Sequence, residues 1–360
     1  MAETKKKKLR SGYTTGACAA AAAKAAAMAL YSGKCPAATE IPFPDGSRVV
    51  FTVHHCEIRD RESECSMIKD AGDDPDVTNG AEIVAVVGRT SGQSAEKIKI
   101  RGGRGVGRVT KPGLAVQAGQ DAINPVPRKM IIQAVSEVLN HQAETEKILV
   151  TIGIVDGEKL AEKTLNQRLG IIGGLSILGT TGIVRPVSAE AWTATISASM
   201  SVAREAGLDE VVLSTGRTSE AAVRKELDLP EEACAMMGDY LEFSLKEAAA
   251  KGFKKIHLAA MWAKVLKGAM GIPQTHVRHG ALEIEDALAF LAALGVDQGI
   301  IDKLKGSNTA REIFVRLLEA KKMDVIESVC RAARDYGFTV SGLDVSVYLV
   351  DGSGQVVTRV

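Results

Sequence analysis

Short apolar strands alternate with helical segments from residue 187 onward, and this alternation restricts the possible folds more than any other feature. Repeated strand–helix–strand units predict a parallel sheet with right-handed crossovers, so we expect a Rossmann-like α/β domain over residues 188–360. The expected strands are Glu210–Leu213, Cys234–Met237, Lys255–Ala260 and a terminal hairpin of Asp344–Val350 with Gln355–Arg359. The expected helices are Val187–Ala206, Ser219–Leu227, Tyr240–Ala250, Ala263–Met270, Ile284–Leu294, Thr309–Ala320 and Met323–Tyr336.

The first half of the chain mixes strands and helices less regularly. A Thr hydroxyl at Thr14 or Thr15 can cap a helix that continues through an alanine run to about Tyr31. Helical spacing of apolar residues predicts a second helix over Pro125–Asn140. Since 360 residues correspond to about two domains, we expect an α+β domain over residues 1–187. Its strands are predicted at Val49–His54, Ala81–Val87, Lys97–Arg101 and Lys147–Ile154.

Composition and charge exclude several classes of protein. The 45 Lys and Arg residues are balanced by 44 Asp and Glu residues, whereas nucleic-acid-binding domains are usually basic. No apolar run approaches the roughly 20 residues of a membrane helix. Lys24 interrupts the alanine-rich stretch that otherwise imitates a secretory signal. The six cysteines form no CxxC pair. We therefore expect a cytoplasmic protein with free thiols and with no nucleic-acid or membrane partner.

The densest group of charged side chains is acidic and lies between residues 69 and 80. It contains Asp70, Asp73, Asp74 and Asp76, and such crowding is unfavourable unless the group binds a cation, a substrate N–H group or water. The spacing does not match a calcium loop, because no glutamate occupies the twelfth position. A solvated acidic turn and a general base with a raised pKa remain equally open.

A glycine-rich segment, Gly102–Gly113, is the second candidate. Its glycines let backbone N–H groups approach an anion, while Arg104 and Lys111 add positive charge; a flexible hairpin loop is the alternative. Arg128 and Lys129 lie in the first turns of a predicted helix, where cations are unfavourable unless an anion is nearby. A ligand rich in carboxylates would fit these cations.

A second glycine-rich segment, Leu169–Pro186, partly matches a phosphate-binding loop. Thr180 replaces the lysine that would reach a phosphate, which argues against ATP hydrolysis. Thr180 and Thr181 occupy a turn before a helix and can bind a ligand through hydroxyl and backbone groups. A buried glycine-rich crossing is the alternative interpretation.

The carboxyl ends of the predicted parallel strands form another candidate, because ligands of open α/β sheets bind there. Thr215, Gly216 and Arg217 follow one strand, and Gly238 and Asp239 follow the next. Glycine permits close approach of a nucleoside and Asp239 can bind ribose hydroxyls, although the dinucleotide fingerprint is absent.

The histidines do not predict a metal site. His54 and His55 are expected to point to opposite faces of one strand. His276 and His279 supply two ligands, whereas structural zinc needs four.

Several segments, taken together, carry a family resemblance that covers nearly the whole chain. They are Leu9–Cys18, Lys69–Thr78, Gly105–Gly107, Ala122–Arg128, Thr164–Asn166, Leu169–Ser188, Ser214–Arg217 and Thr275–His276. In this combination the chain resembles the cobalt-precorrin-5B C1-methyltransferases of anaerobic cobalamin biosynthesis. It departs from the family at Ala263, where a glycine is usual. We therefore leave the segment with Lys264 and Lys267 out of the expected site.

The resemblance implies transfer of a methyl group from S-adenosylmethionine to C1 of cobalt-precorrin-5B, which gives cobalt-precorrin-6A. Cobalt is then part of the tetrapyrrole substrate, and the protein needs no metal site of its own. The cofactor is expected at Thr215, Gly216, Arg217, Gly238 and Asp239. The candidate catalytic bases are Asp73, Asp74 and Asp76. Substrate contacts are expected from Thr14, Thr15, Arg104, Lys111, Arg128, Lys129, Thr180, Thr181 and His276.

Two other functions remain open. A phosphate-handling transferase would bind nucleotide with Mg²⁺, and the missing lysine counts against it. A non-enzymatic corrinoid-binding or delivery protein would bind the macrocycle without S-adenosylmethionine. The sequence does not decide whether the protein forms a homo-oligomer.

Overall fold

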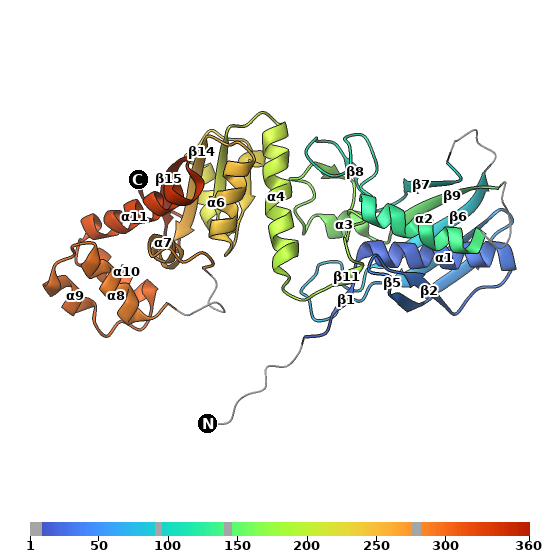
Figure 1. Cartoon of the computed structure of the whole chain (residues 1–360), viewed down its shortest axis with the longest axis horizontal. Coiled ribbons are helices and arrows are strands. Elements are labelled where there is room, and N and C mark those ends of the chain that lie inside the picture. The colour runs from blue at the N-terminus through green and yellow to red at the C-terminus, as the bar shows by residue number, and fades with distance from the viewer. Residues whose placement is uncertain (1–8, 91–95, 140–145, 276–281) are drawn as a thin grey trace, which may run out of the picture. The chain divides into compact units, whose positions relative to one another are not determined.

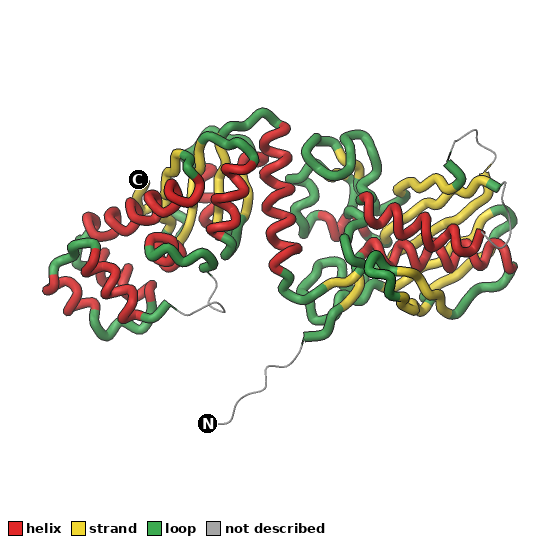
Figure 2. The backbone as a smooth tube through the Cα atoms, viewed as in Figure 1, coloured by secondary structure: helices red, strands yellow, loops and turns green. Residues whose placement is uncertain are grey.

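The computed structural model describes residues 9–90, 96–139, 146–275 and 282–360. The chain divides into two compact units, unit 1 (Met1–Ser188) and unit 2 (Ala189–Val360). Figures 1 and 2 show strands and packed helices in both units. The predicted combination of an α+β part and an α/β part is confirmed by these elements. Each unit is described by itself below.

Unit 1 is built on a five-stranded sheet in the order β4-β5-β6-β9-β7. All neighbouring strands are antiparallel except β7 and β9, which are parallel. The strands are β4 (His55–Ile58), β5 (Glu62–Ile68), β6 (Glu82–Thr90), β9 (Lys147–Ile154) and β7 (Ile98–Gly102). Helices α1 (Thr15–Ser32) and α2 (Pro125–Leu139) run side by side on the sheet (Figure 1). Every second residue of β9 is buried, as expected for a strand with one face in the core.

The alanine run forms helix α1, as predicted. Thr14 caps it, because its hydroxyl accepts a hydrogen bond from the Ala17 N–H group at 3.2 Å, and the helix ends at Gly33 with a φ of 64°. Its alanines are buried, and their small side chains let the backbone approach the sheet and α2 closely. Lys24, within the alanine run, forms an ion pair with Glu137 of α2.

Several short elements of unit 1 differ from the prediction. Strand β3 (Arg48–Thr52), which corresponds to the predicted strand at Val49–His54, forms a hairpin with β2 (Ala38–Pro42), which was not predicted. The predicted strand at Val49–His54 therefore ends earlier, and His54 lies in a bend before β4, so the prediction that His54 and His55 share one strand is wrong. The remaining short elements are β1 (Gly12–Tyr13), β8 (Arg108–Val109), β10 (Ile171–Ile172), β11 (Ile183–Val184) and α3 (Gly157–Ala161).

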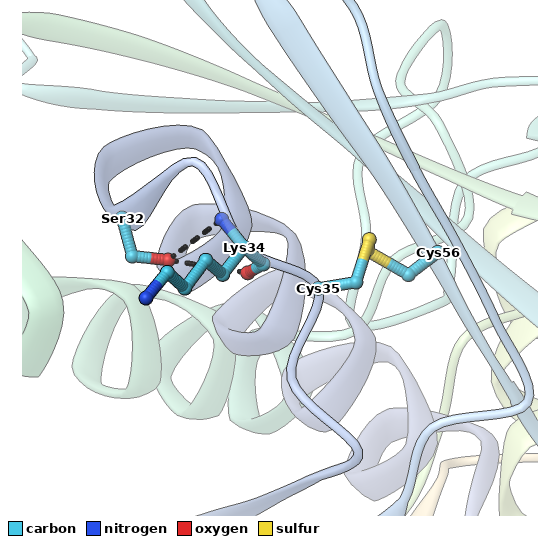
Figure 3. The surroundings of a disulfide bond; sticks show 4 residues. All are labelled: Ser32, Lys34, Cys35 and Cys56. Carbon is cyan, nitrogen blue, oxygen red and sulfur yellow. Dashed lines mark hydrogen bonds between the residues drawn. A yellow bond between two sulfur atoms is a disulfide. The ribbon is translucent and has the colours of Figure 1, made fainter.

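The prediction of six free thiols is also wrong. Cys35, just after α1, forms a disulfide with Cys56 of β4 (Figure 3). The two residues are 21 positions apart in the chain, but their Cα atoms lie 5.8 Å apart, because the segment after α1 packs beside this edge strand. The other four cysteines form no disulfide and are buried: Cys18, Cys65, Cys234 and Cys330.

Unit 2 contains a five-stranded sheet in the order β13-β12-β14-β15-β16. The first four strands are parallel and β16 is antiparallel to β15, which confirms the predicted βαβ pattern and terminal hairpin. The strands are β12 (Glu210–Ser214), β13 (Cys234–Met236), β14 (Lys255–Met261), β15 (Asp344–Val350) and β16 (Val356–Arg359). The helices are α4 (Ala189–Glu205), α5 (Arg217–Arg224), η1 (Glu231–Ala233), α6 (Leu241–Ala250), α7 (Trp262–Ala269), α8 (Ile284–Ala293), α9 (Gln298–Leu304), α10 (Ala310–Glu319) and α11 (Met323–Ser341). Among these, α9 and η1 were not predicted.

A buried histidine links the strands of unit 2. His257 of β14 is 2% exposed, its Nδ1 lies 3.1 Å from the Tyr348 hydroxyl, and its Nε2 lies 2.8 Å from the Glu210 carboxylate. Burial lowers the pKa of His257, although the hydrogen bond that its ring donates to the Glu210 carboxylate opposes this effect. The neutral imidazole is therefore the form that folding favours.

We expect the free energy of unfolding to decrease as the pH falls below the ordinary histidine pKa of about 6.5. Below this pH the histidine of the unfolded chain takes up a proton more readily than the buried ring does. The contribution of neutral His257 to the free energy of unfolding is therefore complete above the unfolded-state pKa and is lost as the pH falls below it. Urea denaturation of the wild type and of His257→Gln between pH 7.5 and 5 tests this. The variant should lose part of the pH dependence, whereas the exposed His55→Gln should retain it; equal dependence in all three would contradict the assignment.

Candidate functional site

The N-terminal segment and the acidic loop meet in unit 1. The Arg10 guanidinium donates two hydrogen bonds to the Asp70 carboxylate, at 2.5 and 2.8 Å. The Asp73 carboxylate accepts from the Arg10 N–H group at 2.7 Å, and the Asp73 N–H group donates to the Arg10 carbonyl at 2.9 Å. The Arg10 side chain lowers the pKa of Asp70 to about 2, with help from the Gly72 N–H group. These contacts bring two segments that are 60 residues apart into one structure.

Glycine is required where these segments cross. A Cβ atom on Gly12 would lie 2.3 Å from the Gly72 nitrogen and 2.1 Å from the Ala71 carbonyl carbon. Gly72 has a φ of 69°, and a Cβ there would meet the Arg10 oxygen at 2.2 Å. Only two facing glycines allow the backbones to come this close.

A buried lysine organises the rest of the acidic loop. The Lys69 side chain is 1% exposed and its ammonium donates to the Asp76 carboxylate at 2.6 Å. The other Asp76 oxygen accepts from the N–H and hydroxyl groups of Thr78, both at 2.7 Å. Burial alone would raise the pKa of Asp76, but the hydrogen bonds from Lys69 and Thr78 outweigh it and hold the pKa below its usual value. Asp76 is therefore a fixed anion.

The segment around Thr180 joins the same site. The Thr14 N–H group donates to the Gly182 carbonyl at 3.0 Å, and the Leu178 N–H group donates to the Thr15 hydroxyl at 2.9 Å. Further along, the Asp74 carboxylate accepts from the Val187 N–H group at 2.9 Å. The structure therefore brings together three of the predicted segments: the N-terminal segment with Thr14 and Thr15, the acidic loop, and the glycine- and threonine-rich segment.

The turn at residues 179–181 offers donors to a ligand. Within the described ranges, the backbone N–H groups of these three residues donate no hydrogen bond to another residue. Thr180 and Thr181 are exposed, and the Thr181 hydroxyl contacts the backbone of Ile183. The turn precedes the short strand β11, whereas the sequence predicted that a helix follows it directly.

The other glycine-rich segment is a closely packed backbone crossing. The Gly103, Gly105 and Gly107 N–H groups donate to the Ile152 carbonyl, the Glu158 carboxylate and the Leu175 carbonyl, respectively. A Cβ on Gly157 would lie 2.7 Å from the Gly105 Cα atom. These N–H groups are thus bonded within the protein, and the predicted flexible loop or anion cradle is replaced by a rigid junction.

The four cations predicted to bind substrate have different surroundings. The Lys111 side chain packs over Gly170 and donates to the Arg168 carbonyl at 3.3 Å. The Arg128 guanidinium donates to the Ile123 and Ile100 carbonyls at 3.0 and 3.3 Å. Arg104 and Lys129 are exposed. Lys111 and Arg128 thus donate to backbone carbonyls, while Arg104 and Lys129 are accessible to a ligand.

The predicted cofactor residues of unit 2 lie at the carboxyl edge of its sheet. Thr215, Gly216 and Arg217 follow β12, while Gly238 and Asp239 follow β13, and these two strands are neighbours. A Cβ built on Gly216 would meet nothing within 4 Å, so the space above this backbone is open. A ligand can approach the end of β12 closely.

Lys264 is a residue that the sequence interpretation set aside. Its ammonium forms an ion pair with the Asp239 carboxylate and donates to the Thr275 carbonyl at 3.0 Å. The Thr275 hydroxyl also donates to Asp239, at 3.0 Å, and Lys267 donates to the same Thr275 carbonyl at 3.0 Å. Burial lowers the pKa of Lys267, and neighbouring Lys264 adds to this effect. The helix after β14, α7, thus belongs to this edge of the sheet.

His276 lies outside the described residues. Within the described ranges, no group of three or more His, Cys, Asp or Glu side chains is arranged to hold a metal ion. None of the helices in those ranges is both long and apolar enough to cross a membrane.

Comparisons with known proteins agree on one family. The family described as CbiD matches residues 2–186, and the CbiD C-terminal domain matches residues 274–360. A protein from Desulfotalea psychrophila named cobalt-precorrin-5B C(1)-methyltransferase is 54% identical, over 99% of each chain. Proteins of the same name from Geobacter sulfurreducens (48% identical, 91% and 92% covered) and Priestia megaterium (40%, 98% and 97%) are also similar. A solved structure of the cobalamin biosynthesis protein cbiD from Archaeoglobus fulgidus is 30% identical and covers 72% of this chain and 79% of its own, with a TM-score of 0.41.

Proposed function

Because the chain belongs to the CbiD family, we propose that it methylates C1 of cobalt-precorrin-5B to give cobalt-precorrin-6A, with S-adenosylmethionine as the methyl donor. The observation that carries this proposal is the 54% identity, over 99% of both chains, to a relative named for that reaction. We also propose a cytoplasmic location, since the named reaction is biosynthetic; fractionation of cells that express the protein tests this.

The methyl donor is assigned to the carboxyl edge of the unit 2 sheet, within a domain of residues 188–360. The open space over Gly216, the turn at Gly238 and the carboxylate of Asp239 fit an adenosine group. Thr215 and Arg217 are the neighbours of Gly216 in the chain. When bound, S-adenosylmethionine would supply a sulfonium methyl group to a ring carbon of the substrate. The protein then acts chiefly by orienting the two reactants.

The macrocycle is assigned to residues of the first domain, 1–187. Its acetate and propionate groups are carboxylates, which pair well with guanidinium and ammonium groups and with backbone N–H donors. The exposed Arg104 and Lys129 and the turn at Thr180 and Thr181 supply such groups, with Thr14 and Thr15 holding the turn. Lys111, Arg128 and His276 remain proposed contacts, the first two through movement away from their carbonyl partners.

Asp73 is the candidate general base that the geometry favours among the three predicted. Asp76 is held by Lys69 and Thr78, and Asp74 accepts from the Val187 N–H group. Asp73 is exposed and its carboxylate accepts from one backbone N–H group, that of Arg10. Its other oxygen, which accepts no hydrogen bond from the described residues, can accept a proton from the macrocycle after methyl transfer, while Asp74 and Asp76 position the loop.

Equilibrium binding tests the assignment of both ligands. Calorimetric titrations of S-adenosylhomocysteine and, separately, of cobalt-precorrin-5B under anaerobic conditions should each show saturable binding. Binding of the macrocycle alone would favour a delivery protein, and Mg²⁺-dependent binding of ATP in place of S-adenosylhomocysteine would favour a phosphate-handling transferase. Asp239→Asn should weaken the binding of S-adenosylhomocysteine and leave the binding of cobalt-precorrin-5B unchanged.

A further inference from the structure

An exposed tryptophan stands at the carboxyl edge of the unit 2 sheet. Trp192, on α4, is 46% exposed, which is unusual for so large an apolar side chain. Its indole N–H group nevertheless donates to the Met237 carbonyl at 3.3 Å, just beyond the end of β13. The ring is therefore held in one orientation while a large part of it faces solvent.

Gly238 forms the base of this arrangement. It has a φ of 57°, and a Cβ atom there would lie 3.0 to 3.1 Å from three atoms of the Trp192 indole. The ring thus packs directly on the backbone of the turn, one residue before Asp239. Glycine at this position allows the aromatic ring and the turn to approach this closely.

The position of the ring matches the chemistry of the neighbouring groups. β13 is the second strand of the parallel sheet in chain order, and in sheets of this type an acidic residue after the second strand binds the ribose of an adenosine. A purine attached to that ribose lies within a few ångströms of it. Trp192 offers an aromatic face at that distance from Asp239, because it packs on the adjacent residue.

We propose that the Trp192 indole is the stacking platform for the adenine ring of the methyl donor, beside Asp239. The inference rests on the proposed function, since it assumes an adenosine-containing ligand. Stacking of a base on a fixed aromatic ring removes apolar surface from water and costs little conformational entropy, because the indole is already anchored. The ring gives affinity for a purine, and Asp239 gives the contact to the sugar.

The chain has two tryptophans, which makes the test direct. Trp262 is buried, with 3% of it exposed. The variant Trp262→Phe therefore keeps Trp192 as its one tryptophan, whose fluorescence can be followed alone. Titration with S-adenosylhomocysteine should quench and shift its fluorescence. In the wild type, the same ligand should protect the exposed indole from acrylamide, a measurement that needs no substitution.

Variants of Trp192 give the energetic test. Trp192→Ala should lower the affinity for S-adenosylhomocysteine, measured by calorimetry, at least about tenfold. Trp192→Phe retains an aromatic ring and should lower this affinity less. Phe338→Ala is the matched control, because Phe338 is 58% exposed but lies near the end of α11, shortly before the amino end of β15. It should bind like the wild type. Macrocycle binding should be unchanged in all three variants.

The outcomes separate the inference from the proposed function. Wild-type binding of S-adenosylhomocysteine with no change in Trp192 fluorescence, no acrylamide protection and equal affinity in Trp192→Ala overturns the platform but leaves the methyl donor in place. No binding to the wild type overturns both. Quenching by the macrocycle alone assigns Trp192 to the other ligand and overturns the inference.

Discussion

Replacement of Lys69 by methionine is expected to lower the free energy of unfolding by about 3 kcal/mol. The substitution keeps much of the buried volume but removes the ammonium that pairs with Asp76 at 2.6 Å. The Asp76 carboxylate, only partly exposed, then keeps the two hydrogen bonds from Thr78 but loses its counter-charge. An unpaired charge of this kind is costly, because water can solvate it only in part.

Urea denaturation followed by far-UV circular dichroism measures this effect. Both tryptophans lie in unit 2, so their fluorescence reports that unit separately. Lys159→Met is the matched control: its ion pair with Asp156 is also in unit 1, but the Lys159 side chain is 79% exposed, and loss of such a pair should change stability little. An equal decrease in the free energy of unfolding in Lys69→Met and Lys159→Met would show that Lys69 does not hold the acidic loop in place.

The Lys69 variant should also change the acid sensitivity of the protein. Because the pKa of Asp76 is held below its usual value, its contribution to stability is complete above the unfolded-state pKa of about 3.9 and is lost as the pH falls below that. Without Lys69, the pKa of Asp76 is lowered less. The stability difference between wild type and Lys69→Met should therefore narrow in acid, and a constant difference from pH 6 to pH 3 would contradict the ion pair.

Asp73→Asn should reduce turnover by about 100-fold or more while leaving the fold intact. The amide oxygen of asparagine can still accept the Arg10 N–H group, so the contact between the N-terminal segment and the acidic loop is kept. What is lost is the ability of this side chain to take a proton. The KM for the macrocycle should change little, because Asp73 is assigned to proton removal rather than to binding.

Asp74→Asn and Asp76→Asn are the matched comparisons for Asp73→Asn. Asp76→Asn should lower stability, since it leaves the buried Lys69 without its anion, and Asp74→Asn should keep its acceptor for the Val187 N–H group and most of its activity. Single-turnover rates and melting temperatures for the three proteins separate these effects. Near-normal turnover in all three would remove the acidic loop from the chemistry.

The regular elements were predictable because their signals are local. The alanine run, capped by Thr14 and ended at Gly33, contains its own start, interior and stop. The same holds for β9, whose alternating burial follows the sequence, and for the strands of unit 2, whose apolar runs are short and bounded. Each of these assignments depends on residues within one element.

The missed elements depend on partners far along the chain. β5 carries Glu62 and Glu64 on one face and has no long apolar run, so its assignment as a strand depends on β4 and β6 on either side. β1 has two residues and exists because β11, about 170 positions later, pairs with it. The Cys35–Cys56 disulfide likewise depends on how the segment after α1 packs, which spacing does not reveal.

The candidate site shows the same division. The residue types in the acidic loop were conspicuous, but Arg10 and Lys69, which hold it, gave no signal by composition alone. The segment with Gly105 was interpreted as a flexible loop or an anion-binding loop, whereas the absence of side chains at Gly105 and Gly157 permits a tight backbone crossing. Lys264 was left out of the expected site because of Ala263, yet it forms an ion pair with Asp239, which lies 25 positions earlier in the chain.

The most direct test of the proposed function is anaerobic incubation of the purified protein with cobalt-precorrin-5B and S-adenosylmethionine labelled with ¹³C in its methyl group. We expect mass spectrometry to show a corrinoid product heavier by one labelled methyl group, and ¹³C NMR to place that methyl on C1, with S-adenosylhomocysteine formed in equal amount. Unchanged macrocycle after prolonged incubation, under conditions in which both ligands bind, would contradict the proposed methyl transfer.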